Sequence, residues 1–300
     1  MSDNPFGKLS SAGLDFTPTI RNDTYPSIDP TKANLSGKSV LITGASKGLG
    51  RATALSFAKA GASTIIIAAR SPLNSLLPTL KAAAQEANRP EPKIITLSLD
   101  VTDESSVSAA AETISKELKT LDILINNAGY LESPWLPVAD SNPTDWWASM
   151  TTNIKGPYLV TRAFLPLVLA SPTKTIINMS SVGAHRMAPG ASAYQTSKLA
   201  SCRFTEFLVV EYGKQGLIAL AVHPGGVKTD LANGMPEWMH KVLIDEPELA
   251  ADSMVWLVRE RREWLSGRFV SCTWDVDELT GKKEKILEGD LLKVRMAVEF

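Results

Sequence analysis

The feature that most constrains the fold is a regular alternation of short apolar strands and longer helices after residue 37. Predicted strands cover residues 38–43, 63–69, 93–99, 121–126, 175–179, 217–222 and 268–271. Predicted helices lie between them, over residues 49–60, 73–88, 104–118, 146–170, 192–214 and 248–260. Because strands separated by helices pair in parallel, this order predicts one α/β domain, a doubly wound parallel sheet covered by helices on both faces.

The N-terminal residues fall outside this alternation. Residues 1–36 carry scattered aromatic residues among Pro18, Pro26 and Pro30, and they follow neither a helical nor a strand period. We interpret them as an arm without a core of its own. Such an arm can lie across the body or a neighbouring subunit, or it can be disordered. The predicted domain is residues 37–300.

Composition and charge exclude several classes of protein. The formal net charge is −1, so there is no basic excess for binding a nucleic-acid backbone. The two cysteines, Cys202 and Cys272, cannot form a disulfide framework, and buried thiols suit a reducing compartment. The N-terminus lacks a secretory pattern, and the apolar runs are too short to cross a bilayer. We therefore expect a cytoplasmic protein without a membrane partner.

A Tyr194-x-x-x-Lys198 pair lies within the predicted helix 192–214. Residues four apart share one face of a helix, so the phenol and the ammonium project to the same side. Ser181 lies thirteen positions upstream, after the predicted strand 175–179. A phenol, an ammonium and a hydroxyl that converge at a strand end suggest proton transfer. Alone, the pair also fits an ordinary helix whose lysine is solvated.

A glycine-rich turn joins the first predicted strand to the first helix. Its sequence is Thr43-Gly44-Ala45-Ser46-Lys47-Gly48-Leu49-Gly50. Gly44 permits the tight turn, Gly48 lets a pyrophosphate approach the backbone, and Gly50 allows close helix–strand packing. The helix N-terminus offers free N–H groups to phosphates. The alternative is a turn without a ligand, but its place after the first strand favours dinucleotide binding.

The combined motifs resemble one known family. The glycine spacing is Gly-x-x-x-Gly-x-Gly, and Asn126-Asn127-Ala128-Gly129, Ser181 and Tyr194-x-x-x-Lys198 follow it. Over about residues 37–272 the sequence resembles the classical short-chain dehydrogenase/reductase family, and residues 269–275 with the tail of about 275–300 resemble fungal members. The resemblance implies a Rossmann-type, three-layer fold, a nicotinamide cofactor, and hydride transfer between a carbonyl and an alcohol.

The resemblance also implies catalytic roles for four residues. Tyr194 would donate a proton to the carbonyl oxygen, Ser181 would hydrogen-bond that oxygen, and Asn153 would position water for reprotonation. Lys198 would hold the ribose hydroxyls. Because free tyrosine has a pKa of about 10, we expect the Lys198 cation to lower the pKa of Tyr194. No metal is needed for this chemistry.

The implied cofactor-binding residues follow the strand ends. Asp100 matches the acid at the adenine end, and the loop 224–229 resembles the family's loop at the nicotinamide end. The full set is Gly44, Ser46, Lys47, Gly48, Leu49, Gly50, Arg70, Asp100, Val101, Asn127, Ala128, Gly129, Tyr194, Lys198, Pro224, Gly225, Val227 and Thr229.

Charge at the second strand predicts NADP(H) as the cofactor. An NAD(H)-selective site usually ends this strand with Asp or Glu, which bonds the ribose 2′-hydroxyl. Here Ala69 takes that place and Arg70 follows it. The planar guanidinium suits a phosphate, and Lys47 is a second cation within reach. Either cation alone could be a solvated surface charge, but both together favour the 2′-phosphate.

The leading hypothesis is an NADP(H)-dependent oxidoreductase that reduces a small-molecule ketone to a secondary alcohol. The alternative is a non-catalytic NADP(H)-binding sensor or scaffold, because a fold alone does not set function. The presence of all four catalytic candidates favours the enzyme.

Two further segments bear on substrate and assembly. Residues of about 231–247 resemble the family's substrate lid but also fit an amphipathic surface helix. The candidate lining residues outside this segment are Tyr130, Leu131, Trp135, Val182, His185 and Met187. Apolar residues on more than one face of helices 146–170 and 192–214 predict a homodimer or homotetramer.

Overall fold

Seven parallel strands form one sheet in the computed structural model, which describes residues 12–296. The sheet order is β3-β2-β1-β4-β5-β6-β7. The strands are β1 (Ser39–Thr43), β2 (Thr64–Ala69), β3 (Lys93–Ser98), β4 (Ile123–Asn126), β5 (Thr175–Met179), β6 (Ile218–His223) and β7 (Arg268–Ser271). The strand order changes direction between β1 and β4, which places a crevice at their carboxyl ends. The predicted doubly wound parallel sheet is confirmed.

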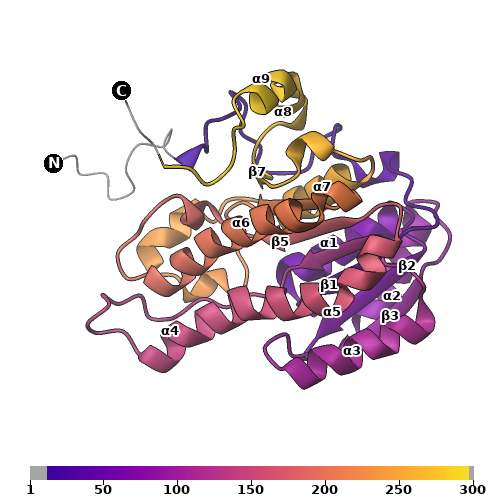
Figure 1. Ribbon diagram of the computed structural model, residues 1–300, viewed down its shortest axis with the longest axis horizontal. Coiled ribbons are helices and arrows are strands. Elements are labelled where there is room, and N and C mark those ends of the chain that lie inside the picture. The colour runs from indigo at the N-terminus through magenta and orange to yellow at the C-terminus, as the bar shows by residue number, and fades with distance from the viewer. Residues whose placement is uncertain (1–11, 297–300) are drawn as a thin grey trace.

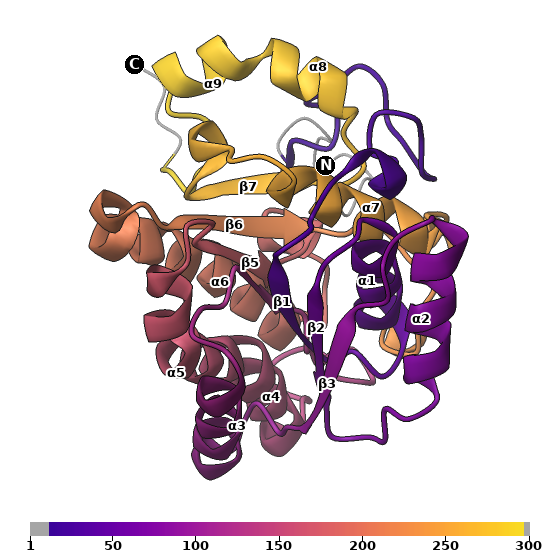
Figure 2. The same ribbon diagram turned by 90° about the vertical axis from the view of Figure 1, so that its right-hand side faces the viewer.

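Helices cover both faces of this sheet (Figures 1 and 2). In Figure 2, α1 and α2 lie to the right of the sheet, and α3, α4 and α5 lie to the left. The helices that precede β7 are α1 (Gly48–Lys59), α2 (Leu76–Glu86), α3 (Glu104–Glu117), α4 (Pro143–Met150), α5 (Gly156–Ala170), α6 (Ser192–Tyr212) and α7 (Pro247–Val258). One apolar core includes Phe57 and Trp256, and the other includes Phe164 and Leu208. The fold is a single three-layer α/β/α domain.

The strands are apolar because both of their faces are covered. Every residue of β1, β2, β4, β5, β6 and β7 is buried, whereas β3 at one edge has exposed positions. Continuous apolar runs are typical of parallel strands covered on both faces. The opposite edge strand, β7, is covered by the C-terminal segment, and the Phe269 N–H donates to the Leu292 carbonyl at 2.8 Å.

The predicted helix over residues 146–170 is divided in the structure. α4 ends at Met150, a π-helical turn covers Thr151–Lys155, and α5 begins at Gly156. A π turn adds a residue to one helical turn and is frequent at functional sites. Hydrophobic periodicity does not reveal it, because the apolar residues continue on both sides. Asn153 lies in the middle of this turn.

The two ends of the described chain pack together. Two short helices that the sequence did not predict, α8 (Val276–Gly281) and α9 (Lys283–Glu288), follow β7. The indigo N-terminal segment runs beside α8 (Figure 2). Arg21 pairs with Asp275 at 2.7 Å, and the Thr19 hydroxyl donates to Glu278 at 2.6 Å. Residues 12–36 of the predicted arm therefore lie across the body of the domain. Residues 1–11 and 297–300 lie outside the described part of the chain.

Cys202 and Cys272 are both free and buried. Burial raises the pKa of the Cys202 thiol to about 11 and that of Cys272 to about 12. Because the thiolate is the reactive form, both groups are poor nucleophiles at neutral pH. Within residues 12–296, no helix is both long and apolar enough to span a membrane, and no group of His, Cys, Asp and Glu side chains is arranged to hold a metal.

Candidate active site

A cavity of about 320 Å³ lies at the carboxyl ends of the central strands. Its wall is built by the glycine turn after β1, the residues that follow β2, β3, β4 and β5, one face of α6, and the loop after β6. All of the predicted cofactor-binding residues line it except Gly225 and Val227. The topology therefore brings these scattered segments to one place, where an open parallel sheet usually binds its ligand.

Gly225 and Val227 lie behind this lining and shape the loop after β6. Val227 is buried and forms a parallel bridge with Asp245. Gly225 has a φ of 96°, and a Cβ there would lie 2.6 Å from an Asp245 carboxylate oxygen. The same oxygen accepts the Gly226 N–H at 2.5 Å. These two residues support the cavity wall without facing the cavity.

The glycine turn is pressed against the loop that follows β4. Gly44 has a φ of 66°, and a Cβ there would lie 2.9 Å from the Cα of Ala128. A Cβ on Gly50 would lie 2.6 Å from the Asn127 amide nitrogen, which donates to the Thr43 carbonyl at 2.8 Å. The first helical turn of α1 begins at Gly48, and its free N–H groups belong to residues that line the cavity. A side chain in this turn would fill the space that the glycines leave.

Several lining residues were not predicted from the sequence. They are Ser71, Leu99, Thr102, Thr152, Met179, Ser180 and Asp230. Most of them adjoin a predicted residue or follow a strand, so their position at a strand end was the available signal. Asp230 adjoins the predicted Thr229, but nothing in the sequence indicated its partner. Its carboxylate pairs with the Lys47 ammonium at 2.7 Å, and the side chains of Lys47 and Asp230 are 70% and 68% exposed.

The wall after β2 and β3 holds a second, looser pair of charges. An Arg70 guanidinium nitrogen lies 3.9 Å from an Asp100 oxygen, and Arg70 is 75% exposed. Asp100 accepts the Thr102 N–H at 2.9 Å and its hydroxyl at 2.7 Å. Burial by itself raises the pKa of Asp100, but the Thr102 hydrogen bonds and the Arg70 cation outweigh it and lower the pKa overall. Each cation expected at the cofactor thus faces a carboxylate.

Tyr194 and Lys198 lie on one face of α6, and both line the cavity. The Lys198 ammonium is 5.3 Å from the centre of the Tyr194 ring and donates to the Met179 carbonyl at 2.8 Å. The Tyr194 side chain hydrogen-bonds the Ser181 side chain. Burial lowers the pKa of Lys198 to about 8. The structure therefore brings together the phenol, the ammonium and the hydroxyl.

The acidity of Tyr194 differs from the sequence-based expectation. Burial raises the pKa of Tyr194 to about 12; the hydrogen bond with Ser181 acts in the lowering direction, and the Glu132 carboxylate acts in the raising direction. A buried phenolate loses its hydration, and this cost outweighs an ammonium that lies beside the ring and is bonded to a carbonyl. The sequence predicted that Lys198 would lower the pKa of Tyr194. In the structure this pKa is raised, so the prediction was wrong. At neutral pH Tyr194 is a neutral phenol.

Asn153 joins the π turn to two other elements. Its side-chain oxygen accepts the Tyr130 N–H at 2.9 Å, and its amide nitrogen donates to the Tyr130 carbonyl at 2.8 Å and to the Ser197 hydroxyl at 2.9 Å. An amide nitrogen has two N–H groups, and both are used here. The side chain holds the loop after β4 against α6. Its oxygen keeps a second lone pair, so the water-positioning role stays a prediction.

The expected lid contains two 3-10 segments, Ala232–Gly234 and Glu237–Val242, in place of one amphipathic helix. Trp238 packs edge-on against Trp135, with 6.4 Å between ring centres. His185 packs against Phe269 of β7, with 4.8 Å between ring centres. None of the candidate substrate-lining residues His185, Tyr130 and Trp135 lines this cavity, so their contact with a substrate stays a prediction. Trp135 thus connects the lid segment to the loop after β4.

The sheet order and the cavity at its carboxyl edge define an α/β protein of the dinucleotide-binding type of architecture. A family model described as short chain dehydrogenase matches residues 38–240. The chain is 50% identical over 288 residues to the short chain dehydrogenase mpl6 of Monascus purpureus, covering 96% of this chain and 98% of that protein. The chain therefore belongs to the short-chain dehydrogenase/reductase family of oxidoreductases. The predicted family and its similarity to fungal members are confirmed.

Solved structures agree with this assignment. The NADPH-bound carbonyl reductase from chicken fatty liver is 26% identical, with a TM-score of 0.64 over 78% of this chain and 96% of that one. The 3-ketoacyl-(acyl-carrier-protein) reductase from Brucella melitensis, complexed with NADH, is 25% identical, with a TM-score of 0.68 over 79% and 97%. Structures similar to this chain therefore bind NADPH in one case and NADH in the other.

Proposed function

We propose that this protein is an NADP(H)-dependent oxidoreductase that reduces a small-molecule ketone to a secondary alcohol, with Tyr194 as the general acid. The observation that carries the proposal is that Tyr194 and Lys198 meet at the cavity, with Ser181 hydrogen-bonded to the Tyr194 side chain behind the lining. Because burial keeps Tyr194 protonated at neutral pH, it is ready to give a proton to a carbonyl oxygen. Ser181 orients that oxygen, and Lys198 holds the ribose.

The residues of the cavity fit a nicotinamide dinucleotide, which supplies the hydride when it is bound. The glycine turn leaves one wall free of side chains, and the α1 N-terminus adds N–H groups for a pyrophosphate. Asp100 and Val101 hold the adenine end in this proposal. Residues 127–129 lie at the ribose, and the loop 224–229 lies at the nicotinamide.

The choice of NADP(H) rests on the charges of this chain, because similar structures bind either cofactor. Ala69 ends β2 without a carboxylate, and the next residue, Arg70, lines the cavity. Lys47 also lines the cavity, and in this structure its ammonium is paired with the Asp230 carboxylate. A 2′-phosphate carries more charge than a carboxylate, so it can draw both cations away from Asp100 and Asp230.

We further propose a homo-oligomer in the cytoplasm. Tyr158 on α5 and Phe207 and Val210 on α6 are large apolar side chains that are 49%, 53% and 77% exposed. Covering such residues with a second copy would bury apolar surface. Sedimentation that shows only monomer at micromolar concentration would contradict the oligomer.

The enzymatic proposal is tested by following NADPH oxidation with a panel of ketones, quinones and aldehydes, with NADH measured in parallel. We expect turnover with at least one ketone and a rate that falls as the pH rises, because ionisation removes the Tyr194 proton. Turnover of the reverse reaction should rise with pH for the same reason. Tight NADPH binding without turnover of any compound would favour the non-catalytic sensor.

A further inference from the structure

A buried carboxylate lies at the beginning of the helix that carries Tyr194. Glu132, in the loop after β4, is only 6% exposed. Both of its oxygens lie 3.0 Å from the Tyr194 backbone nitrogen, whose N–H they accept. One of them also accepts the Ser149 hydroxyl of α4 at 2.7 Å. Glu132 therefore binds two helices that belong to different parts of the sequence.

This carboxylate takes the place of a missing helix cap. α6 begins at Ser192, and the preceding residue, Ala191, has no side chain that can accept a hydrogen bond. The first N–H groups of a helix have no partner within the helix and carry its positive dipole end. A side-chain oxygen normally satisfies the N–H of the second or third helical residue. Tyr194 is the third residue of α6, and Glu132 supplies that oxygen from a distant loop.

We propose that Glu132 is a positioning residue of the reaction, which fixes the first turn of α6, and with it the Tyr194 phenol, from the loop after β4. The inference rests on the proposed role of Tyr194. Because Glu132 binds the backbone of Tyr194 itself, any displacement of the carboxylate moves the residue that carries the proton. A displacement of about 1 Å at a reacting group can cost about a hundredfold in rate.

The charge of Glu132 acts on the same phenol. The groups that face Tyr194 are Ser181 after β5, Lys198 on α6 and Glu132 after β4. Of these, the Glu132 carboxylate opposes formation of a second negative charge and raises the pKa of Tyr194. Removing the charge while keeping the hydrogen bonds should therefore lower the pKa of Tyr194.

The loop that holds Glu132 also contacts the lid segment. The Ser133 hydroxyl donates to the Gly234 carbonyl at 3.0 Å, and Trp135 packs against Trp238. At its other end, Tyr130 is bonded to Asn153 of the π turn. Residues 130–135 thus connect the lid, the π turn and the catalytic helix, so Glu132 is placed to transmit lid position to Tyr194.

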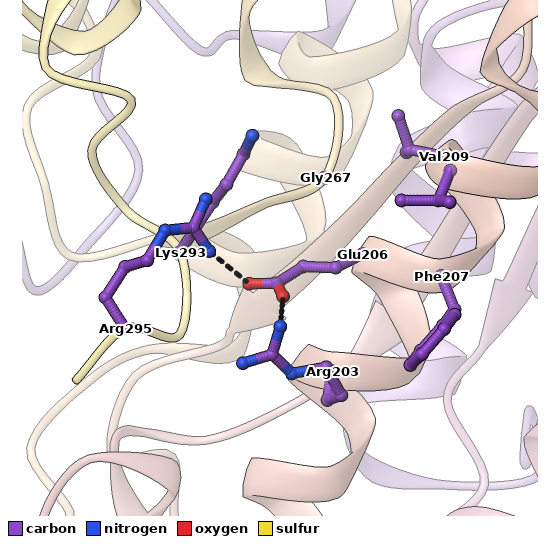
Figure 3. Close-up of a pocket in the computed structure, with 8 residues that line it drawn as sticks. Arg203, Glu206, Phe207, Val209, Gly267, Lys293 and Arg295 are labelled. Carbon is purple, nitrogen blue, oxygen red and sulfur yellow. Dashed lines mark ion pairs between the residues drawn. The ribbon is translucent and has the colours of Figure 1, made fainter.

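Two substitutions separate position from charge. Glu132→Gln removes the charge but keeps an oxygen that accepts the Tyr194 N–H, and its amide nitrogen can donate to the Ser149 hydroxyl oxygen with the direction of that bond reversed. Glu132→Ala removes the acceptor of the Tyr194 N–H and the acceptor of the Ser149 hydroxyl. Glu206→Gln is the matched control, because Glu206 is a poorly exposed glutamate within α6 itself. It lies on the outer side of that helix and pairs with Arg203 and Arg295 (Figure 3).

Hydrogen exchange tests the position without any enzymatic assay. The Tyr194 amide should exchange about ten- to a hundredfold faster in Glu132→Ala, because a hydrogen bond to a charged acceptor is worth about 1.5–3 kcal/mol. Glu132→Gln should restore most of the protection, and Glu206→Gln should leave it unchanged. Unchanged exchange in Glu132→Ala would overturn the inference, whether or not the protein proves to be an enzyme.

Steady-state kinetics test the effect on the reaction. In Glu132→Ala we expect kcat to fall about ten- to a hundredfold while NADPH affinity stays within about twofold. In Glu132→Gln kcat should recover, and the pH at which alcohol oxidation rises should move to lower pH. A fall in kcat that Glu132→Gln does not rescue, or an unmoved pH profile in that variant, would overturn the inference. If Glu132→Ala does not fold, the pH profile of Glu132→Gln decides.

Discussion

The two ends of the cavity are built on different physical principles. At the end formed by β2 and β3, Arg70 and Lys47 are largely exposed and face the carboxylates Asp100 and Asp230. At the α6 end, Lys198 and Asn153 are 5% and 2% exposed, and hydrogen bonds within the chain hold them. One end presents charges to solvent, whereas the other encloses polar groups among fixed partners.

In the proposed enzyme, the exposed end would select the cofactor and the enclosed end would carry out the proton transfer. An exposed ion pair contributes about 0–1 kcal/mol, so an incoming phosphate can replace its partner at little cost. A buried polar group left without its partner costs about 1–3 kcal/mol, so the enclosed groups keep their geometry. Exposed charge is suited to choosing between cofactors, and enclosed hydrogen bonds are suited to holding a proton donor in place.

The largest expected effect is at the enclosed end. Tyr194→Phe keeps the ring but removes the proton donor, so kcat should fall about 10²–10⁴-fold while NADPH affinity is retained. Tyr158→Phe is the matched control, because Tyr158 is about half exposed on α5, outside the cavity lining. The measurement is turnover of a verified substrate together with a fluorescence titration of NADPH. Activity of Tyr194→Phe within a few-fold of the natural protein would refute its role as the acid.

The same end should be sensitive to loss of its hydrogen bonds. Asn153→Ala leaves the Tyr130 backbone groups and the Ser197 hydroxyl without the side chain that bonds them. We expect the free energy of unfolding to fall by about 3 kcal/mol, measured by urea denaturation. Asn74→Ala, at an exposed position, should change it by less than about 0.5 kcal/mol. Equal stability of the two variants would mean that the Asn153 bonds contribute nothing.

At the charged end, the expected effect is on cofactor choice. Arg70→Ala should weaken NADPH binding about ten- to a hundredfold, because a charge-assisted hydrogen bond contributes about 1.5–3 kcal/mol. NADH lacks the 2′-phosphate, so its affinity should barely change. Arg51→Ala, an exposed arginine on α1, serves as the control. Equal losses for NADPH and NADH would show that Arg70 does not recognise the phosphate.

The smallest expected effect concerns the ion pair between Lys47 and Asp230. Asp230→Asn should free the ammonium and strengthen NADPH binding by up to about fivefold, the equivalent of about 1 kcal/mol. The gain should fade as salt is raised from 0.1 M to 1 M, because the pair is exposed. Titrations at the two salt concentrations, repeated in the Lys47→Ala background, measure it. A gain that persists without Lys47 would assign the effect to another group.

Local patterns in the sequence determined much of the fold and part of the site. The alternation of strands and helices follows from which residues are apolar at which period, and these periods are visible within ten to twenty residues. The glycine turn and the Tyr194–Lys198 spacing are equally local, and the structure brings both to the same cavity. The π turn at Asn153 and the short helix α8 escaped prediction. Contacts with distant segments help to hold both, although Asp275 also caps α8 locally.

Only the tertiary structure decided which distant residues pair at the site and what pKa Tyr194 has. Glu132 reaches the Tyr194 backbone across 62 residues, and Lys47 meets Asp230 across 183. No local pattern reports such a pair, because each depends on where the sheet brings two loops. The protonation of Tyr194 is decided in the same way: its spacing from Lys198 predicted a lowered pKa, whereas burial raises it to about 12. Solvation depends on everything packed around a group, so it is a property of the folded chain.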